Sequence, residues 1–501
     1  LRTNACGHAL SLSSLGSKPQ SRPCSLRSFG KMKWEFLFAH SLGSNPCIRG
    51  LYEALLTDIF MADQNLMEKI ISLAKRRGFV FPGSEIYGGL AGTFDYGPFG
   101  VVLKENVERL WLQMFRDSRD DMHGVDAAIL MNPKIWEASG HVSGFSDPLV
   151  ECGKCKKRFR ADHLDGSKKC PECQGELGGV RQFNMMFKTH AGANEDTSAV
   201  VYLRPETAGG IFTNFKNVVD SLHPKLPFGI AQIGKAFRNE IAPRDFIFRL
   251  RELSQMEIEY FVHPSSWEQA FEEWRKMMHL FAEAVGLPKN AVHELEVPAE
   301  DRAHYSKRTI DFEFDYPFGR KELWGLAYRT DFDLSAHANA SNTELTYLDE
   351  ETKEKFIPHV IEPSLGVDRT ILAILSSAYR EDDMGGEVRT YLALAPKIAP
   401  VKAMVSPLLK NKPELVAKAR EVRAELKRIH PAIAWDDNGN IGKRYRRQDE
   451  IGTPFCITID FDTLGETPER KDTVTLRHRD TGEQERLTVP EVAERIRVAN
   501  L

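Results

Sequence analysis

The chain has 501 residues, of which 42% are hydrophobic and 28% are charged, and its formal net charge at pH 7 is −4. This composition is typical of a globular protein of roughly two to three domains, and no run of about 18 apolar residues predicts a membrane span. The weak negative charge argues against extensive coating of nucleic acid, although basic runs such as 154–160 and 442–447 are compatible with a local binding surface.

Residues 1–60 differ in composition from the rest of the chain. The chain begins with Leu1, no acidic residue precedes Glu35, and serine is frequent. Such a composition resembles a transit peptide, which would make the protein organellar; otherwise a cytoplasmic location is expected. The alternative is an upstream extension of the reading frame, with Met61 as the true start. In either case we expect this leader to be disordered and to have no role in function.

A helix is predicted from Asp63 to a closing glycine, Gly78, and a glycine-rich run follows at 88–100. The run lacks the spacing of a phosphate-binding P-loop, a motif that occurs nowhere in the sequence, so any nucleotide must be bound by cationic side chains. Amphipathic helices are predicted after Pro98 and from Ser266. We interpret their apolar stripes as core or subunit interface rather than cofactor sites. The stripes comprise Leu103, Val107, Leu110, Trp111, Met114 and Phe115 in the first helix, and Trp267, Phe271, Trp274, Met278 and Phe281 in the second.

Four of the eight cysteines form a C-x2-C-x14-C-x2-C pattern, at Cys152, Cys155, Cys170 and Cys173. Two CxxC turns bring four thiolates into the tetrahedral arrangement that Zn²⁺ prefers, and an all-cysteine set predicts a closed structural zinc site in an insertion at 150–180. The alternative is a group of four incidental reduced thiols. The remaining cysteines form no disulfide framework, so we expect a reducing compartment.

The segment VYLRPETAGG at 201–210 places Arg204 and Glu206 in a turn after an apolar strand. Taken alone, this turn is best interpreted as a surface ion pair.

The most informative segment is 237–262, which predicts two strands joined by a polar loop. Successive side chains in a strand point to opposite faces. One face therefore carries Arg249, Arg251, Leu253, Gln255, Glu257 and Glu259, joined by Arg238 and Glu240 from the first strand, whereas Met256, Ile258, Tyr260 and Val262 share the other face. One interpretation is a half-solvated hairpin with surface ion pairs. The other is a charged face that binds a ligand of both signs, such as a nucleotide beside an ammonium group.

The segment HVIEPSLGVDRTILAIL at 359–375 predicts a buried strand that ends at Pro363 and is followed by a helix. Ser364 then lies at the end of the strand, and Arg369 lies in the first turn of the helix. A helix N-terminus favours anions, and an arginine added there can hold a terminal phosphate bidentately.

Beyond Gly386, strand-like runs alternate with helical ones. The clearest helix is 414–429, with a predicted buried stripe of Leu415, Val422, Leu426 and Ile429. This pattern predicts a separate α/β domain over 386–501, after a larger domain over 61–385.

Taken together, these segments resemble the signature motifs of class II aminoacyl-tRNA synthetases, and they are most similar to the dimeric (α2) glycyl-tRNA synthetase family. YGPFGVVLKENV resembles the first motif, FRNEIAPR with FRLREL the second, and IEPSLGVDR the third. The resemblance extends over about 64–500 and includes RADHL, RQFNMMFKT, ELWGLAYRTDFDL and GKRYRRQDEIGTPFCITID. It implies an α+β fold, in which a class II catalytic domain has an antiparallel sheet flanked by helices and a zinc-knuckle insertion. The C-terminal α/β domain is then an anticodon-binding domain.

The resemblance also implies a site for ATP in a bent form, with Mg²⁺. Arg238 matches the arginine at the α-phosphate, Arg249 and Arg369 match the pair at the γ-phosphate, and Glu322 matches an acid that acts through Mg²⁺. The implied ATP site comprises Arg238, Asn239, Glu240, Phe248, Arg249, Arg251, Glu252, Leu253, Glu322, Leu323, Gly366, Val367, Asp368 and Arg369. The chain departs from the family pattern at Leu253, where a phenylalanine usually stacks on adenine, and at Gly209, where the family has glutamine.

In the implied glycine site, Glu206 and Glu257 meet the ammonium group of glycine beside Ser364. The whole site comprises Arg158, Arg160, Glu206, Leu253, Ser254, Gln255, Met256, Glu257, Glu362, Pro363 and Ser364. The implied activity is the ligation of glycine to tRNA(Gly) through glycyl-adenylate, carried out by a homodimer. The alternative is a catalytically silent paralogue that binds nucleic acid as an accessory or regulatory protein; retention of the three motif arginines argues against it. The basic residues Lys443, Arg444, Arg446 and Arg447 either touch RNA or have a structural role.

Overall fold

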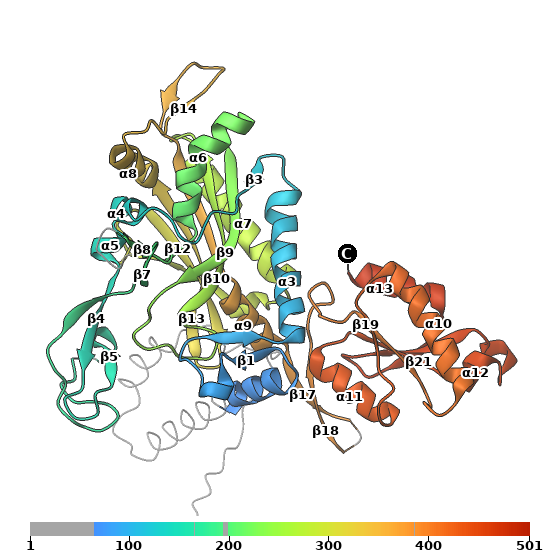
Figure 1. Cartoon of the computed structure of the whole chain (residues 1–501). Helices are drawn as coiled ribbons and strands as arrows, with labels where there is room; N and C mark the ends of the chain where they lie inside the picture. Colours follow the sequence, from blue (N-terminus) through green and yellow to red (C-terminus); the bar gives the residue numbers. More distant parts are fainter. Residues whose placement is uncertain (1–64, 165, 194–198, 385, 501) are drawn as a thin grey trace, which may run out of the picture. The chain divides into compact units, whose positions relative to one another are not determined.

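The computed structural model describes residues 65–164, 166–193, 199–384 and 386–500 (Figure 1). The predictions for residues 1–60 lie outside this part of the chain. Residues 65–76 are helical, and Gly78 follows with a φ of +70°, a left-handed conformation that glycine adopts without strain. None of the helices among the described residues combines the length and the apolar character that crossing a membrane requires.

A seven-stranded sheet forms the centre of the larger domain, as predicted. Its neighbouring strands are antiparallel except for one parallel pair at the edge, β3 with β9. In spatial order the strands are β11 (Val292–Glu296), β12 (Arg308–Tyr316), β13 (Gly319–Thr330), β16 (His359–Gly366), β10 (Glu252–Val262), β9 (Phe228–Phe237) and β3 (Met122–Gly124).

The charged hairpin differs from the prediction in where its strands begin and end. β9 ends at Phe237 and β10 begins at Glu252, so the arginines expected on the strands lie in the connecting segment 238–251. This segment turns at Asp245 and Phe246, which both have a positive φ, and is closed by an isolated bridge between Arg244 and Arg249. Within β10 the predicted alternation is confirmed, because the side chains of Met256, Ile258, Tyr260 and Val262 belong to the main hydrophobic core.

Helices cover both faces of this sheet (Figure 1). On the core face, α3 (Pro98–Leu112), α7 (Trp267–Ala284) and α9 (Val367–Ala378) contribute to one large apolar cluster. Phe115, just beyond α3, contacts Trp274 and Phe281 of α7, with ring centroids 5.7 and 5.4 Å apart. A second cluster on the other side joins α6 (Ala208–Leu222) and α8 (Phe332–Ser341) to Phe228, Phe261 and Val360 of the sheet. The predicted stripes of the two amphipathic helices are therefore core.

The strand before α9 does not end at Pro363, contrary to the prediction. β16 continues to Gly366, and Pro363 pairs in register with Leu326 of β13. On its other side, the pairing with β10 skips from Ile361 to Ser364. Proline has no N–H to donate, and here it occupies a position that is not paired with β10.

The segment that contains the insertion has three strands, β4 (Ser146–Glu151), β5 (Arg158–Arg160) and β6 (Arg181–Asn184), in the order β5-β4-β6. It follows the short helices α4 (Lys134–Ala138) and α5 (His141–Gly144). The remaining short elements of the larger domain are the strands β1 (Val80–Pro82), β2 (Phe94–Tyr96), β7 (Lys188–His190), β8 (Val200–Tyr202), β14 (Tyr347–Leu348) and β15 (Lys355–Phe356).

The C-terminal domain is α/β, as predicted. Its five-stranded mixed sheet has the order β20 (Ile433–Trp435), β19 (Ala403–Pro407), β21 (Phe455–Ile459), β22 (Thr473–His478) and β23 (Gln484–Thr488). Its helices are α10 (Pro413–Ile429), α11 (Ile441–Ile451), the short α12 (Phe461–Leu464) and α13 (Val489–Ala499). The predicted domain boundary lies between the paired strands β17 (Tyr379–Asp383) and β18 (Val388–Leu392).

The buried stripe of α10 differs from the prediction at one position. Leu415, Ala419, Val422 and Leu426 are buried, but Ile429 is 46% exposed. Ile429 is the last helical residue, where the helix passes beyond the edge of the core. Ala419, which the prediction omitted, belongs to the buried stripe.

Candidate active site

A cavity of about 360 Å³ opens on the charged face of β10, β13 and β16 and is bordered by the segment 238–251. It brings together most of the residues predicted for the two implied sites. Those that line it are Glu206, Arg238, Glu240, Phe248, Arg249, Leu253, Ser254, Gln255, Glu257, Glu322, Leu323, Glu362, Ser364, Gly366, Asp368 and Arg369.

The other predicted site residues do not border the cavity. Met256 and Val367 are fully buried in the core, and Pro363 is held within β16. Arg251 stabilises the loop instead, because its guanidinium donates to the carbonyl oxygens of Ala91 (2.8 Å) and Glu240 (3.1 Å). For Met256 and Pro363 this follows from the alternation of β10 and β16, which turns every second side chain away from the charged face.

Four further residues are placed at the margin of the site or outside it. Glu252 pairs with Lys235 at 3.0 Å, and the backbone N–H of Asn239 donates to Met185. Arg158 is exposed and pairs with Glu151 at 3.1 Å, whereas Arg160 contacts Asp147 and Asp162. None of the four faces the cavity.

Three guanidinium groups line the cavity, two from the segment 238–251 and one from α9. Arg238 donates through Nε to the Pro205 carbonyl (3.0 Å), and Arg249 lies 3.7 Å from Glu240. Arg369, at the start of α9, lies 3.0 Å from the Glu322 carboxylate. Burial lowers the pKa of Arg249. We call the part of the cavity lined by these three arginines its cationic end; the carboxylates of Glu240 and Glu322 lie beside two of them.

The other end of the cavity is acidic. Glu257 on β10 accepts hydrogen bonds from the Thr207 N–H (3.0 Å) and hydroxyl and from the Ser364 hydroxyl (2.8 Å). Glu362, on the neighbouring strand, pairs with Arg329 at 3.0 Å. Burial raises the pKa of Glu362 to about 8 despite this partner. Glu206, Glu257 and Glu362 all line the cavity, and we call this part of it the acidic pocket.

The turn at 204–206 is not a surface ion pair, contrary to the interpretation favoured for it alone. Arg204 is 2% exposed and donates to the carbonyl oxygens of Lys235 (2.6 Å) and Ala127 (2.7 Å). It ties the turn to β9 and so presents Glu206 to the cavity. Glu206 pairs with His141 rather than with Arg204.

Sequence reasoning missed several residues of the site. Asp311 and Tyr305 line the cavity, and Arg329 holds both Glu362 and Asp333, the latter through two nitrogens at 2.7 and 2.8 Å. Burial, with the nearby Glu322, raises the pKa of Asp311 to about 7. Alternation along RTIDFEFDY places Asp311 on one face of β12, but that pattern alone gave no reason to single it out.

The two positions that depart from the family pattern both lie in or near the site. Leu253 lines the cavity and packs against the main core. Gly209 lies in the first turn of α6, where an added Cβ would come within 3.0 Å of the Trp136 ring. A larger residue here requires Trp136 to shift.

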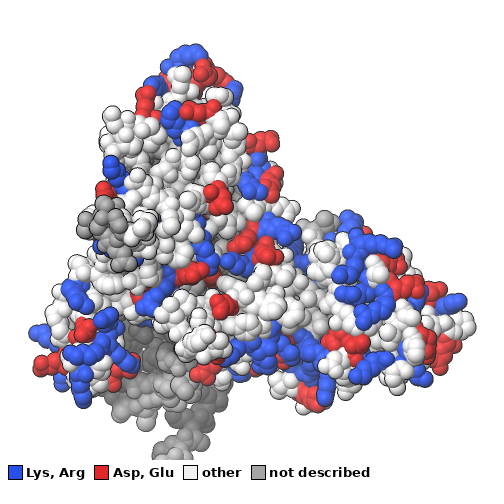
Figure 2. Space-filling model, viewed as in Figure 1, with Lys and Arg blue, Asp and Glu red and all other residues white. Residues whose placement is uncertain are grey.

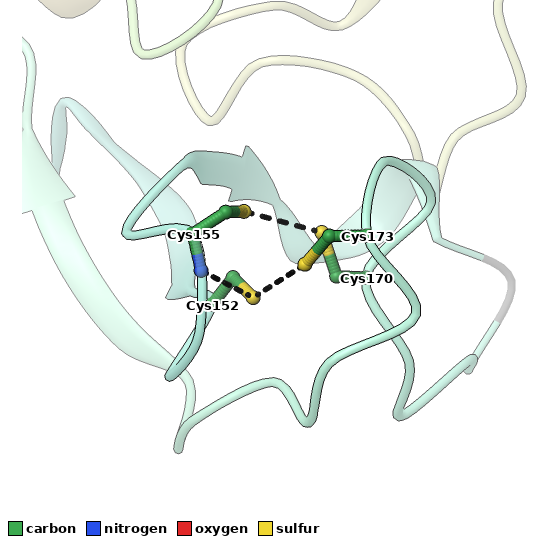
Figure 3. A group of neighbouring side chains, drawn as sticks. All are labelled: Cys152, Cys155, Cys170 and Cys173. Atoms are coloured by element: carbon green, nitrogen blue, oxygen red, sulfur yellow. Dashed lines mark hydrogen bonds between the residues drawn. The ribbon is translucent and has the colours of Figure 1, made fainter.

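The four predicted zinc ligands converge, with all their Sγ atoms within 4.8 Å of one another (Figure 3). The Sγ atoms of Cys152 and Cys173 are 3.5 Å apart, and those of Cys155 and Cys170 are 3.7 Å apart. A tetrahedron with Zn–S bonds of about 2.3 Å has edges of about 3.8 Å. The geometry and the all-thiol set therefore fit a zinc ion.

Lysine and arginine side chains gather over this insertion, with acidic side chains among them (Figure 2, lower left). Within the basic run 154–160, Lys157 pairs with Glu172 (2.8 Å) and Arg158 with Glu151.

In the run at 442–447, Arg444 is buried and donates to Ser406 (2.6 Å) and Gly439 (2.7 Å). A structural role is thus supported for Arg444.

Comparison with known families identifies both domains. The profile of the tRNA synthetase class II core domain (G, H, P, S and T) matches residues 187–378, and that of the anticodon-binding domain matches residues 402–498. The match to the core domain contains the second and third motifs, and the match to the anticodon-binding domain contains the whole C-terminal sheet.

Curated relatives match most of the chain. The glycine–tRNA ligase of Lachnospira eligens is 50% identical over 460 residues, which cover 86% of this chain and 98% of the relative. Those of Treponema denticola and Clostridium tetani are 49% and 48% identical, over 96% and 99% of their lengths. With the class II core and the anticodon-binding domain in the same order, the chain belongs to the glycine–tRNA ligase family of class II aminoacyl-tRNA synthetases.

Proposed function

We propose that the protein is a glycine–tRNA ligase, which activates glycine with ATP and transfers the glycyl group to the 3′ end of tRNA(Gly). The observation that carries this proposal is the single cavity in which three arginines face an acidic pocket. Such a cavity is complementary to a triphosphate at one end and to a small ammonium compound at the other. The family of the chain supports the same assignment.

In this proposal the triphosphate occupies the cationic end. Arg238 contacts the α-phosphate, and Arg249 and Arg369 hold the γ-phosphate, because guanidinium groups match phosphate geometry. The carboxylates of Glu322 and Asp311 line the same end and offer the oxygen donors that Mg²⁺ prefers. When bound there, Mg²⁺ neutralises charge on the phosphates. Glu240 and Leu253 are then left for the adenosine part.

Glycine occupies the acidic pocket, with its ammonium group between Glu206 and Glu257. The hydroxyl of Ser364 and two donors of Thr207 fix the orientation of Glu257. Every competing amino acid carries a side chain at Cα, so a pocket packed against Cα rejects it by steric clash. A second, editing site is therefore unnecessary.

The reaction needs positioning and charge neutralisation rather than a protein nucleophile. The carboxylate of glycine attacks the α-phosphorus of ATP, forming the glycyl-adenylate and releasing pyrophosphate. The 3′-terminal ribose hydroxyl of tRNA then attacks the glycyl carbonyl carbon and releases AMP. Arg238 supports the first step by stabilising charge on the α-phosphate.

The alternative, a silent paralogue, is disfavoured because all three arginines not only persist but line one cavity. The homodimer is also a proposal. The exposed apolar side chains of Ile86 and Tyr87, just before the glycine-rich run, and of Leu90 within it support a contact surface of this kind. The cytoplasmic location stays a prediction.

Pyrophosphate exchange into ATP, measured with each of the twenty amino acids in turn, tests the proposed function. We expect exchange with glycine and none above background with alanine or serine. Exchange that no amino acid stimulates, in a folded protein that binds ATP, would favour the silent paralogue instead.

A further inference from the structure

The carboxylate of Glu206 faces a histidine that no motif includes. His141 Nε2 lies 3.3 Å from Glu206 Oε2, and the two side chains are only 13% and 12% exposed. His141 is the first residue of α5, in the segment that leads into the insertion with the four-cysteine cluster. The pair thus connects this segment to the acidic pocket.

The imidazole ring is held on three sides. Its Nδ1 lies 2.8 Å from the Ser139 hydroxyl, and its faces and edges pack against Trp136 and Phe145, with centroid distances of 5.6 and 5.3 Å. Trp136 is fully buried, and Gly140, between Ser139 and His141, turns the chain with a φ of +81°. Both the ring plane and the direction of Nε2 are therefore fixed by the fold.

Glu206 depends on this ring more than Glu257 depends on any one partner. Glu257 accepts from two donors of Thr207 and from Ser364. Among the residues that the structure describes, only His141 brings a donor within 3.5 Å of the Glu206 carboxylate. Arg329 and Arg238 act on Glu206 from further away and are engaged with Asp333, Glu362 and the Pro205 carbonyl.

The charges around Glu206 support the same dependence. Burial by itself would raise the pKa of this carboxyl, but His141, followed by Arg329 and Arg238, lowers it to about 2. Three other titratable groups interact with Glu206: Glu362 on β16, His337 on α8 and Tyr305. Without His141, burial would favour the protonated form of Glu206.

We propose that His141, oriented by Ser139, is a positioning residue for glycine: its Nε2–H holds one oxygen of Glu206 and leaves the ionised carboxylate aimed at the ammonium group. The inference rests on the proposed function. Both forms of the ring can act in this way. In the neutral form Ser139 donates to Nδ1, and in the protonated form Nδ1–H donates to Ser139; Nε2–H faces Glu206 in each.

The test compares Michaelis constants for glycine and for ATP in the pyrophosphate exchange reaction. His141→Ala should raise the KM for glycine by about 10- to 100-fold, the effect of losing a hydrogen bond to a charged group, with the KM for ATP changed by less than about twofold. Raising the pH should lower the KM for glycine in this variant more than in the wild type, because a Glu206 without its partner ionises only at higher pH. His141→Gln keeps a neutral donor and should recover part of the affinity.

His279→Ala serves as the matched control. His279 contacts Glu294 through Nε2 at 2.7 Å and packs against Phe312, but it does not border the cavity. The variant removes another histidine–glutamate contact, which is shorter than the 3.3 Å contact of His141 with Glu206, and the KM for glycine should stay unchanged.

The outcomes separate the inference from the proposed function. A wild-type protein without glycine-dependent exchange refutes the proposed function. An active wild type together with an unchanged KM for glycine in His141→Ala, or with equal increases for glycine and ATP, overturns the role of His141 and leaves the function intact. If His141→Ala does not fold, Ser139→Ala decides: a glycine-selective increase in KM supports the inference, and an unchanged KM overturns it.

Discussion

Arg369 and Glu322, separated by 47 positions in the sequence, meet at the cationic end of the cavity. Arg369 Nη1 lies 3.0 Å from Glu322 Oε2 and 3.2 Å from the carbonyl oxygen of the same residue. The guanidinium also lies 4.6 Å from the centroid of the Phe248 ring. The side chain of Arg369, which belongs to helix α9, is thus fixed by contacts with strand β13 and with the segment 238–251. Its guanidinium lowers the pKa of Glu322. Such fixation suits a group that must stabilise a phosphate without reorganising.

Replacing Arg369 by alanine should therefore reduce glycine-dependent pyrophosphate exchange by at least about 10²–10³-fold, the usual effect of removing one electrostatic contact to a developing charge. The fold should stay intact, as judged by circular dichroism and thermal unfolding. Arg320→Ala is a suitable control. Arg320 pairs with Asp315 at 2.8 Å at the end of the hairpin formed by β12 and β13, the hairpin that also carries Glu322, and it does not border the cavity. Undiminished exchange in Arg369→Ala would remove this residue from the mechanism.

Much of the fold was predictable because local patterns agree with tertiary packing. The alternation in β10 and the apolar stripes of α3 and α7 are satisfied by the core on the same face of the sheet. The cysteine pattern predicted the cluster because the four thiols lie within a short stretch of sequence, so their spacing alone indicates that they converge. By contrast, the ends of the charged hairpin were placed wrongly, since the loop at 238–251 is fixed by contacts such as Arg251 with Ala91, far away in the sequence.

The acidic pocket shows the same limit. Glu206 and Glu257 were predicted from resemblance, but Arg329, Asp311 and His141 were not, because no short motif marks them. They matter only once β12, β13 and α5 are brought together. The turn at 204–206 was misinterpreted for a related reason: burial, which decides between an ion pair and a structural arginine, is not visible in a short segment.

Glu257→Gln should weaken the binding of glycine far more than that of ATP. The substitution removes the negative charge and places an amide where Thr207 and Ser364 now donate. We expect the KM for glycine to increase by about 10- to 100-fold and that for ATP by less than about twofold. Glu252→Gln, on the same strand but paired with Lys235, should leave both constants unchanged. Equal losses for the two substrates would show that the assignment of Glu257 is wrong.

Elemental analysis of the purified protein should find about one zinc ion per chain. Cys155→Ser should lower the zinc content and the thermal stability, because Cys155 is one of the four converging thiols. Cys456→Ser is the matched control: Cys456 is buried in β21, apart from the cluster, and its loss should leave the zinc content unchanged. A metal-free protein whose stability is insensitive to chelators would show that the cluster is not a metal site.

Glu259 should make the stability of the protein depend on pH. Its side chain is fully buried, and among the described residues neither carboxyl oxygen has a hydrogen-bond partner. Burial, and next the neighbouring Glu362, raise the pKa of Glu259 well above its ordinary value. The folded protein therefore retains a proton that the unfolded chain releases. The corresponding contribution to stability is complete below the ordinary pKa and is lost as the pH rises toward the raised one.

Glu259→Gln removes this equilibrium and keeps the shape of the protonated side chain. Between about pH 5 and pH 8, the free energy of unfolding should fall less steeply in the variant than in the wild type. Urea denaturation at several pH values measures both slopes, with the exposed Glu252→Gln as the control. Parallel slopes for wild type and Glu259→Gln would mean that Glu259 is already ionised or hydrated in the folded state.

The most direct test of the central claim, that this cavity joins glycine to the α-phosphate of ATP, is an active-site titration with α-labelled ATP and pyrophosphatase. The account predicts a rapid burst of enzyme-bound glycyl-adenylate with glycine, no burst with alanine, and release of AMP when tRNA(Gly) is added. A protein that binds ATP but forms no glycyl-adenylate, or forms aminoacyl-adenylate equally well with alanine, would contradict it.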